Sequence, residues 1–165
     1  MIGGLDRLNA LPREDAEAQL LACCGSRQWA RRLAAERPFA SADDLADAAD
    51  RIWRSLPAED WLEAFAAHPR IGQSSSNAWV RREQAGTESA SPETLANLAD
   101  VNREYEERFG HIFIVCATGK SAAEMLALAE SRLHNDPRTE RAIAAEEQRK
   151  IMRLRLAKLL EAEGA

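Results

Sequence analysis

Ile112-Phe113-Ile114-Val115-Cys116-Ala117 is the one β-like run in a chain of 165 residues, so the fold class depends on whether this run can form part of a sheet. A strand needs a partner strand to form a stable sheet. The sequence contains no second run of this kind. We therefore expect residues 112–117 to form a buried extended connector within a helical protein.

Helix signals occupy the rest of the chain. Ser41 to Asp44 and Ser121 to Glu124 have the spacing in which a hydroxyl caps the first turn and an acid three positions later reaches back. Ser91-Pro92 and Asp136-Pro137 place a capping side chain before a proline at the first helical position, and Gly110 ends the helix that begins at Pro92. Predicted helices cover residues 13–24, 26–35, 41–55, 58–67, 77–85 and 92–109, and two more begin at 121 and 136. The fold prediction is one all-α domain, residues 1–165, of about eight helices.

Composition excludes several classes of protein. The 22 basic and 27 acidic residues give a net charge of -5 and are interspersed, which argues against a nucleic-acid partner. The N-terminus lacks the pattern of a secretory signal, and no apolar stretch approaches the roughly 18 residues of a membrane span. The three cysteines, Cys23, Cys24 and Cys116, lack the spacing of a disulfide framework or a zinc site. These features predict a soluble protein of the reducing cytoplasm, with no membrane partner and no metal.

His68-Pro69-Arg70-Ile71-Gly72 is the stretch most suited to chemistry. Pro69 disfavours helical backbone angles at the residue before it, so His68 should end a helix or be extended. An unperturbed imidazole has a pKa of about 6.5, which suits proton transfer near neutral pH. A capping or core histidine is the alternative, and the local sequence leaves both open.

Glu83 is a second candidate. On a helix it follows Trp79 by four residues and Val80 by three, so its carboxylate would share a face with two large apolar side chains. The alternative is a surface glutamate paired with Arg81 or Arg82.

Two further places could contact a ligand. Ile151, Arg155 and Leu159 recur at steps of four, which puts the Arg155 guanidinium in an apolar row, whereas Arg153 points elsewhere. Arg155 could also bury only its stem while its charged end reaches water. The connector 112–117 has backbone groups without ladder partners, which a ligand with amide edges could satisfy, although core packing is the commoner reason for such a run.

Other sequence patterns do not support a different chemistry. His111 follows the Gly110 helix stop, and His134 sits in the last helical turn before Asn135-Asp136-Pro137. A positive charge is favourable at both places, and we interpret both histidines as caps. The chain has no cluster of metal ligands, nucleophile elbow, Walker loop or dinucleotide fingerprint.

Taken in order along the chain, these motifs resemble the 2-oxo-4-hydroxy-4-carboxy-5-ureidoimidazoline (OHCU) decarboxylases, the ureide-pathway enzymes that make (S)-allantoin. The elements that carry the resemblance are Leu8-Asn9, Trp29, Arg37-Pro38-Phe39, His68 to Gly72, Trp79 to Gly86, Asn102, Tyr105, Phe109-Gly110, Phe113 to Ala117 and Ile151 to Leu156. They cover nearly the whole chain, and their joint occurrence in order is far more specific than any one of them.

The resemblance implies an all-helical, cofactor-free decarboxylase, commonly a homodimer, that acts on OHCU. It places catalytic roles on His68, Glu83 and Arg155. It places substrate contacts on Pro69, Val80, Arg81, Arg82, Glu83, Gln84, Phe113, Ile114, Val115, Cys116 and Ala117.

One departure affects the expected substrate contacts. The family usually has serine where this chain has Val80, so a hydroxyl contact is missing or comes from a neighbour such as Ser76 or Thr87. Two alternatives therefore stay open: a diverged homologue that acts on a related ureido or imidazoline acid, and a non-catalytic helical interaction module.

Overall fold

The computed structural model describes residues 3–72 and 77–161, which contain nine α-helices, one 3₁₀ helix and no β-strand. The elements in chain order are α1 (Gly4–Ala10), α2 (Arg13–Cys23), α3 (Arg27–Ala35), α4 (Ala42–Ser55), α5 (Ala58–Ala66), α6 (Ala78–Glu83), η1 (Ala85–Thr87), α7 (Pro92–Phe109), α8 (Ala122–Arg132) and α9 (Pro137–Glu161). The all-α prediction is confirmed, and all eight predicted helices are present.

Local capping contacts explain why the predicted helix starts are accurate. The Ser41 and Ser91 hydroxyls accept hydrogen bonds from the backbone N–H groups three residues later, at 3.0 and 3.1 Å. Ser121 forms the complete reciprocal capping box with Glu124. Gly110 ends α7 with φ +78°, a left-handed conformation that favours glycine.

The additional helix is α1, which has no side-chain cap at its start. Its Leu8 is buried, and Gly4 lies so close to the chain at Leu160 that a Cβ there would come within 2.0 Å of the Leu160 carbonyl oxygen. A seven-residue helix depends on such tertiary contacts, because helices this short are marginal alone. The local sequence therefore gave too weak a signal for α1.

The chain divides into two compact units. Unit 1 comprises residues 1–64 and 149–165, and unit 2 comprises residues 65–148. The boundary at residues 148 and 149 falls within α9, so this helix contributes residues to both units. The prediction of a single domain over residues 1–165 stays a prediction.

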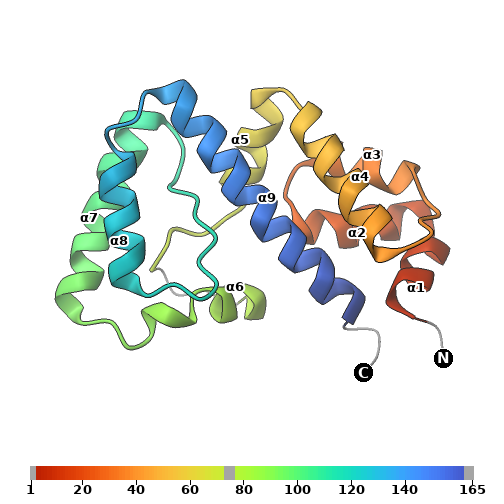
Figure 1. Cartoon of the computed structure of the whole chain (residues 1–165), viewed down its shortest axis with the longest axis horizontal. Coiled ribbons are helices and arrows are strands. Elements are labelled where there is room, and N and C mark those ends of the chain that lie inside the picture. Colours follow the sequence, from red (N-terminus) through yellow and green to blue (C-terminus); the bar gives the residue numbers. More distant parts are fainter. Residues whose placement is uncertain (1–2, 73–76, 162–165) are drawn as a thin grey trace. The chain divides into compact units, whose positions relative to one another are not determined.

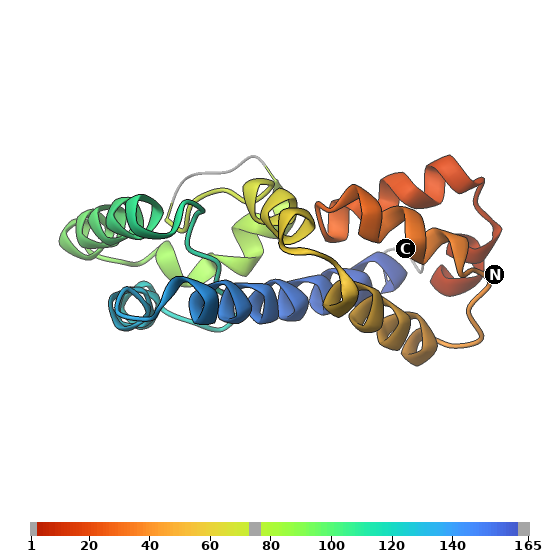
Figure 2. The ribbon, with the colours of Figure 1, turned by 90° about the horizontal axis from the view of Figure 1, so that it is seen from above.

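In unit 1, α2 packs against α3, and α3 against α4 (Figure 2). The core of this unit contains Trp29, Leu33, Ile52 and Trp53, all at most 1% exposed. The Trp29 indole N–H donates to the Ala49 carbonyl at 3.1 Å, so the large ring is buried with its polar atom satisfied.

In unit 2, α7 and α8 lie side by side, joined by the extended segment at residues 111–120 (Figure 1). Phe113, Val115 and Ala117 from that segment pack in one cluster with side chains of α7 and α8. The prediction of a buried extended connector at 112–117 is therefore confirmed. Within the described ranges, no helix is both long enough and apolar enough to cross a membrane.

Candidate active site

His68 lies two residues after the end of α5, in unit 2. It is half-buried, and its Nε2 atom is 2.5 Å from Oε1 of Gln148, a fully buried residue 80 positions later in the chain. Pro69, beside it, is also half-buried. The imidazole is thus held by a side chain from α9 in the same unit.

The segment that follows His68 is fixed by side chains of α7 and by Gln84, the residue that follows α6. The Asn102 amide nitrogen donates to the Ile71 carbonyl at 2.9 Å, and the Gly72 N–H donates to Gln84 Oε1 at 2.9 Å. Arg70 makes two hydrogen bonds to the Glu106 carboxylate, at 2.7 and 2.8 Å. The backbone after His68 is thus held through both a carbonyl group, that of Ile71, and an N–H group, that of Gly72.

Glu83 is at the end of α6 and is buried, at 8% exposure. Val80 is buried on the same helix, whereas Arg81 and Arg82 are exposed. Glu83 is therefore buried on a helix whose Val80 is also buried, and the interpretation as a surface glutamate is wrong.

Glu83 is also electrostatically close to the connector. Burial raises the pKa of the Cys116 thiol, the Lys120 cation opposes that shift, and the carboxylates of Glu147 and Glu83 reinforce it. The structure thus brings the predicted contacts on α6 and on the connector into one neighbourhood of unit 2.

The turn after α6 approaches the far end of the connector. A Cβ on Gly86 would lie 2.0 Å from the Lys120 carbonyl oxygen, so glycine permits this close approach. The Thr87 hydroxyl, one of the two candidates to replace the family serine, donates to the Gln84 carbonyl at 2.8 Å. The other candidate, Ser76, lies outside the described residues.

Side chains satisfy several backbone groups of the connector. The Ile114 carbonyl accepts from Arg132 at 2.7 Å, the Cys116 N–H donates to Glu147 at 3.1 Å, and the Cys116 carbonyl accepts from Lys120 at 2.8 Å. For Val115, 3% exposed, no other described residue supplies a hydrogen-bond partner to the backbone. The Val115 peptide groups fit the predicted use of this segment as a ligand edge.

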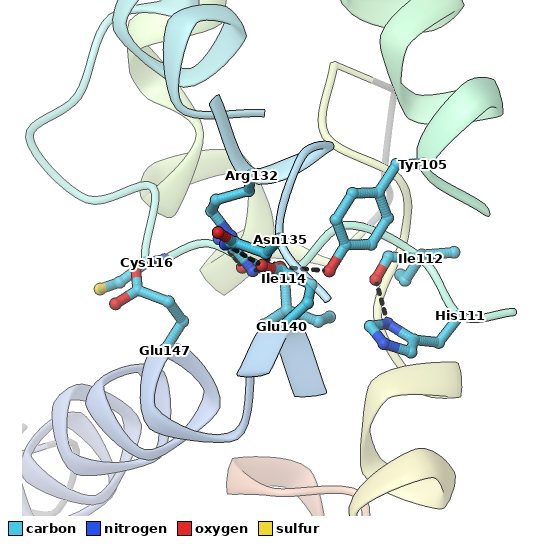
Figure 3. A network of polar contacts seen from close by, with 9 residues as sticks. All are labelled: Tyr105, His111, Ile112, Ile114, Cys116, Arg132, Asn135, Glu140 and Glu147. Atoms are coloured by element: carbon cyan, nitrogen blue, oxygen red, sulfur yellow. Dashed lines mark hydrogen bonds and ion pairs between the residues drawn. The ribbon is translucent and has the colours of Figure 1, made fainter. Parts of the chain in front are cut away.

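A buried polar network anchors the connector, and sequence reasoning did not predict it (Figure 3). Glu140 is fully buried and accepts hydrogen bonds from the Tyr105 hydroxyl, from Arg132 Nε at 2.7 Å and from Asn135 at 3.0 Å. The Arg132 guanidinium lies over the Phe113 ring, 4.6 Å from its centroid. These partners are up to 35 residues apart in the chain, so no local spacing could indicate the network.

The His111 side chain differs from the cap interpretation, whereas the cap interpretation of His134 stays a prediction. The His111 imidazole packs against Phe65, Tyr105 and Phe109, and burial lowers its pKa, which disfavours the positive charge that a cap would carry. Its Nδ1 atom lies 2.9 Å from the Ile112 carbonyl oxygen. His134 lies beyond α8, which ends at Arg132.

Arg155 belongs to unit 1 and is buried, at 8% exposure. It lies near the thiols of Cys23 and Cys24, whose pKa values burial raises to about 12 while the Arg155 charge opposes the shift. Arg153 is partly exposed and contacts Asp47 and Asp50 at 3.4 and 3.2 Å. The predicted difference between the two arginines in burial is therefore correct.

The described residues contain no cluster of three or more His, Cys, Asp or Glu side chains that could hold a metal ion. The model of the OHCU decarboxylase family matches residues 9–157 of the chain. The chain belongs to the OHCU decarboxylase family.

Similar proteins of the OHCU decarboxylase family include the uric acid degradation bifunctional protein TTL of Arabidopsis thaliana. It is 39% identical over 88% of this chain and 48% of its own length, so the chain spans about half of that relative. The OHCU decarboxylase of Amia calva is 32% identical over 76% of this chain and 75% of its own length. A crystal structure of an OHCU decarboxylase in the presence of (S)-allantoin superposes with a TM-score of 0.80 and 39% identity, over 87% of this chain and 97% of that chain.

Proposed function

We propose that the chain is a cofactor-independent carboxy-lyase that converts OHCU to (S)-allantoin and CO₂ in urate degradation. One observation carries the proposal: the likeness to the crystallised OHCU decarboxylase extends over 97% of that chain at 39% identity. The names of the Arabidopsis and Amia calva relatives support the same reaction and pathway.

The chemistry of the substrate explains why no cofactor is needed. The carboxylate leaves from a ring carbon next to a C=N bond, so the electron pair of the broken C–C bond forms a new C=C bond and the displaced π pair moves to nitrogen. The protein then has to orient the substrate and deliver a proton to the adjacent carbon on one face. Orientation and positioned proton transfer are contributions that side chains of a rigid helical protein can make.

In this proposal His68 donates that proton, a role typically worth roughly 10²–10⁴ in rate. Glu83 orients the substrate hydroxyl or ureido N–H groups, and its burial strengthens such hydrogen bonds because the surroundings are poor in water. Arg155 binds the substrate carboxylate or a ureido oxygen through its planar pair of donors.

The remaining contacts follow the same proposal. Pro69 and residues 80–84 bind substrate around Glu83, and the backbone of residues 113–117 offers peptide edges to the ureido group. The backbone of Val115 is buried, and no other described residue supplies it with a hydrogen-bond partner, which supports this use of the segment. Val80 leaves the family's hydroxyl contact to a neighbour or absent, which keeps a related ureido or imidazoline acid as the alternative substrate.

We also propose that the protein assembles as a homodimer and acts in the cytoplasm. The family resemblance supports the dimer, and the cysteine pattern supports a reducing compartment. Light scattering of the purified protein tests the oligomeric state.

The deciding experiment is to add purified protein to freshly generated OHCU and to follow the circular dichroism of the allantoin formed. The proposal predicts a strong signal from one enantiomer. Racemic product at the uncatalysed rate would show that the chain lacks this activity and would favour a non-catalytic interaction module. Turnover of a related acid, with none of OHCU, would favour the diverged homologue.

A further inference from the structure

Gln148 is the immediate partner of the His68 ring. Its Oε1 atom lies 2.5 Å from His68 Nε2, and the glutamine side chain is completely buried, within unit 2. Its own Nε2 atom is buried and has no hydrogen-bond partner within residues 3–72 and 77–161. The Gln148 side chain therefore uses its oxygen atom for the hydrogen bond with His68.

An amide oxygen can accept a hydrogen bond but cannot donate one. Opposite Gln148 Oε1, His68 Nε2 must carry a hydrogen, both in the neutral ring and in the imidazolium form. The proton that the ring gains and loses is then the one on Nδ1. A histidine that acts as an acid also needs an acceptor for its other N–H, and the glutamine oxygen meets that need.

We propose that Gln148 is a positioning residue that holds His68 in the Nε2–H tautomer and makes Nδ1 the atom that transfers the proton. This inference rests on the proposed function of His68. In the protonation step, Nδ1–H delivers its proton to the ring carbon adjacent to the one that lost CO₂. The π pair of the new C=C bond forms the C–H bond, and the electrons of the Nδ1–H bond stay on Nδ1 as its lone pair. The hydroxyl-bearing carbon becomes a carbonyl as its O–H proton passes to the ring nitrogen that received the displaced pair. Nε2–H stays bonded to Gln148.

His111 provides an internal reference for this proposal. Its Nδ1 atom faces the Ile112 carbonyl oxygen at 2.9 Å, another group that only accepts, so His111 should carry its hydrogen on Nδ1. The two rings are thus expected to show opposite tautomers in one protein.

The first test is ¹⁵N NMR of the histidine-labelled wild-type protein at a pH where the imidazoles are neutral, without substrate. The His68→Asn variant identifies the His68 signals. The expected spectrum has a protonated Nε2 on His68 and a protonated Nδ1 on His111. A His68 ring protonated on Nδ1 would mean that the Gln148 amide donates to Nε2, and it would overturn the proposal.

The second test removes the acceptor. In Gln148→Met the two ring nitrogen shifts of His68 should move toward each other as both tautomers become populated. The value of kcat should fall by about 10- to 100-fold, part of what a general acid contributes, with little change in KM. Gln148→Glu retains an acceptor oxygen and should restore the Nε2–H signature.

Gln19→Met is the matched control, because Gln19 lies in unit 1 and its side chain accepts a long 3.4 Å hydrogen bond from Arg7. It should leave the His68 signals and kcat unchanged. A Gln148→Met protein with wild-type shifts and wild-type kcat would refute the positioning role. If the wild-type protein makes no (S)-allantoin, the proposed function fails, while the tautomer measurement still reports on Gln148 independently.

Discussion

Replacing Arg132 with methionine should lower the stability of unit 2 more than any surface arginine substitution. The Arg132 side chain is 9% exposed, and its ion-pair partner Glu140 is fully buried. The same guanidinium donates to the Ile114 carbonyl at 2.7 Å. Methionine retains much of the stem but removes the charged partner of the buried Glu140 carboxylate, to which Tyr105 and Asn135 supply neutral donors.

The expected magnitude follows from that burial. Removing one partner of a buried ion pair costs about 3–5 kcal/mol, because the other charge is left uncompensated. For a chain of this size, about 2–4 °C of melting temperature corresponds to 1 kcal/mol, so the midpoint should fall by about 6–20 °C. Neutralising the carboxylate as well, in Arg132→Met/Glu140→Gln, should restore part of the loss.

The assay is urea unfolding followed by circular dichroism at 222 nm, with Arg103→Met as the matched control. Arg103 is exposed on α7, and its 3.4 Å ion pair with Asp100 is also exposed, so its loss should cost at most about 0.5 kcal/mol. If Arg132→Met is no less stable than Arg103→Met, the buried network does not anchor the connector as described.

Four other outcomes are expected. His68→Asn should remove nearly all turnover while the melting temperature stays within a few degrees, because a half-buried ring contributes little packing; loss of the fold at ordinary temperatures would make His68 structural instead. Arg155→Lys should reduce kcat/KM steeply, because lysine lacks the planar pair of donors, whereas Arg153→Lys should act like wild type. Steady-state kinetics of both variants test this, and a large loss in Arg153→Lys with little change in Arg155→Lys would contradict the assignment. Activity should survive a chelator and dialysis, and recovery only on addition of metal would show a missed site. Burial raises the thiol pKa values of Cys23 and Cys24 to about 12, so the free energy of unfolding should fall as the pH rises above the ordinary thiol pKa of 9.0. The fall should be smaller in the variant with alanine at both positions. If urea titrations at pH 8 and pH 10 show the same loss of stability in the wild type and in this variant, the reasoning is refuted.

Features that depend on neighbours within a few positions can be predicted from the sequence. Ser91 and Ser121 cap helices through hydrogen bonds to residues three positions later, so their spacing in the sequence contains the whole interaction. Helical periodicity likewise separated the buried Arg155 from the solvated Arg153, since one turn of helix places them on different sides.

Contacts between residues that are far apart in the chain depend on the tertiary structure. His68 contacts Gln148, 80 residues later, and Tyr105 contacts Glu140, 35 residues later. Neither pairing corresponds to a periodic pattern in the sequence. The helix α1 also depends on close contact with the chain at Leu160. The physical reason is that a local hydrogen bond is set by backbone geometry, whereas a buried polar partner is selected only when packing brings two segments together and leaves each group no water to bind.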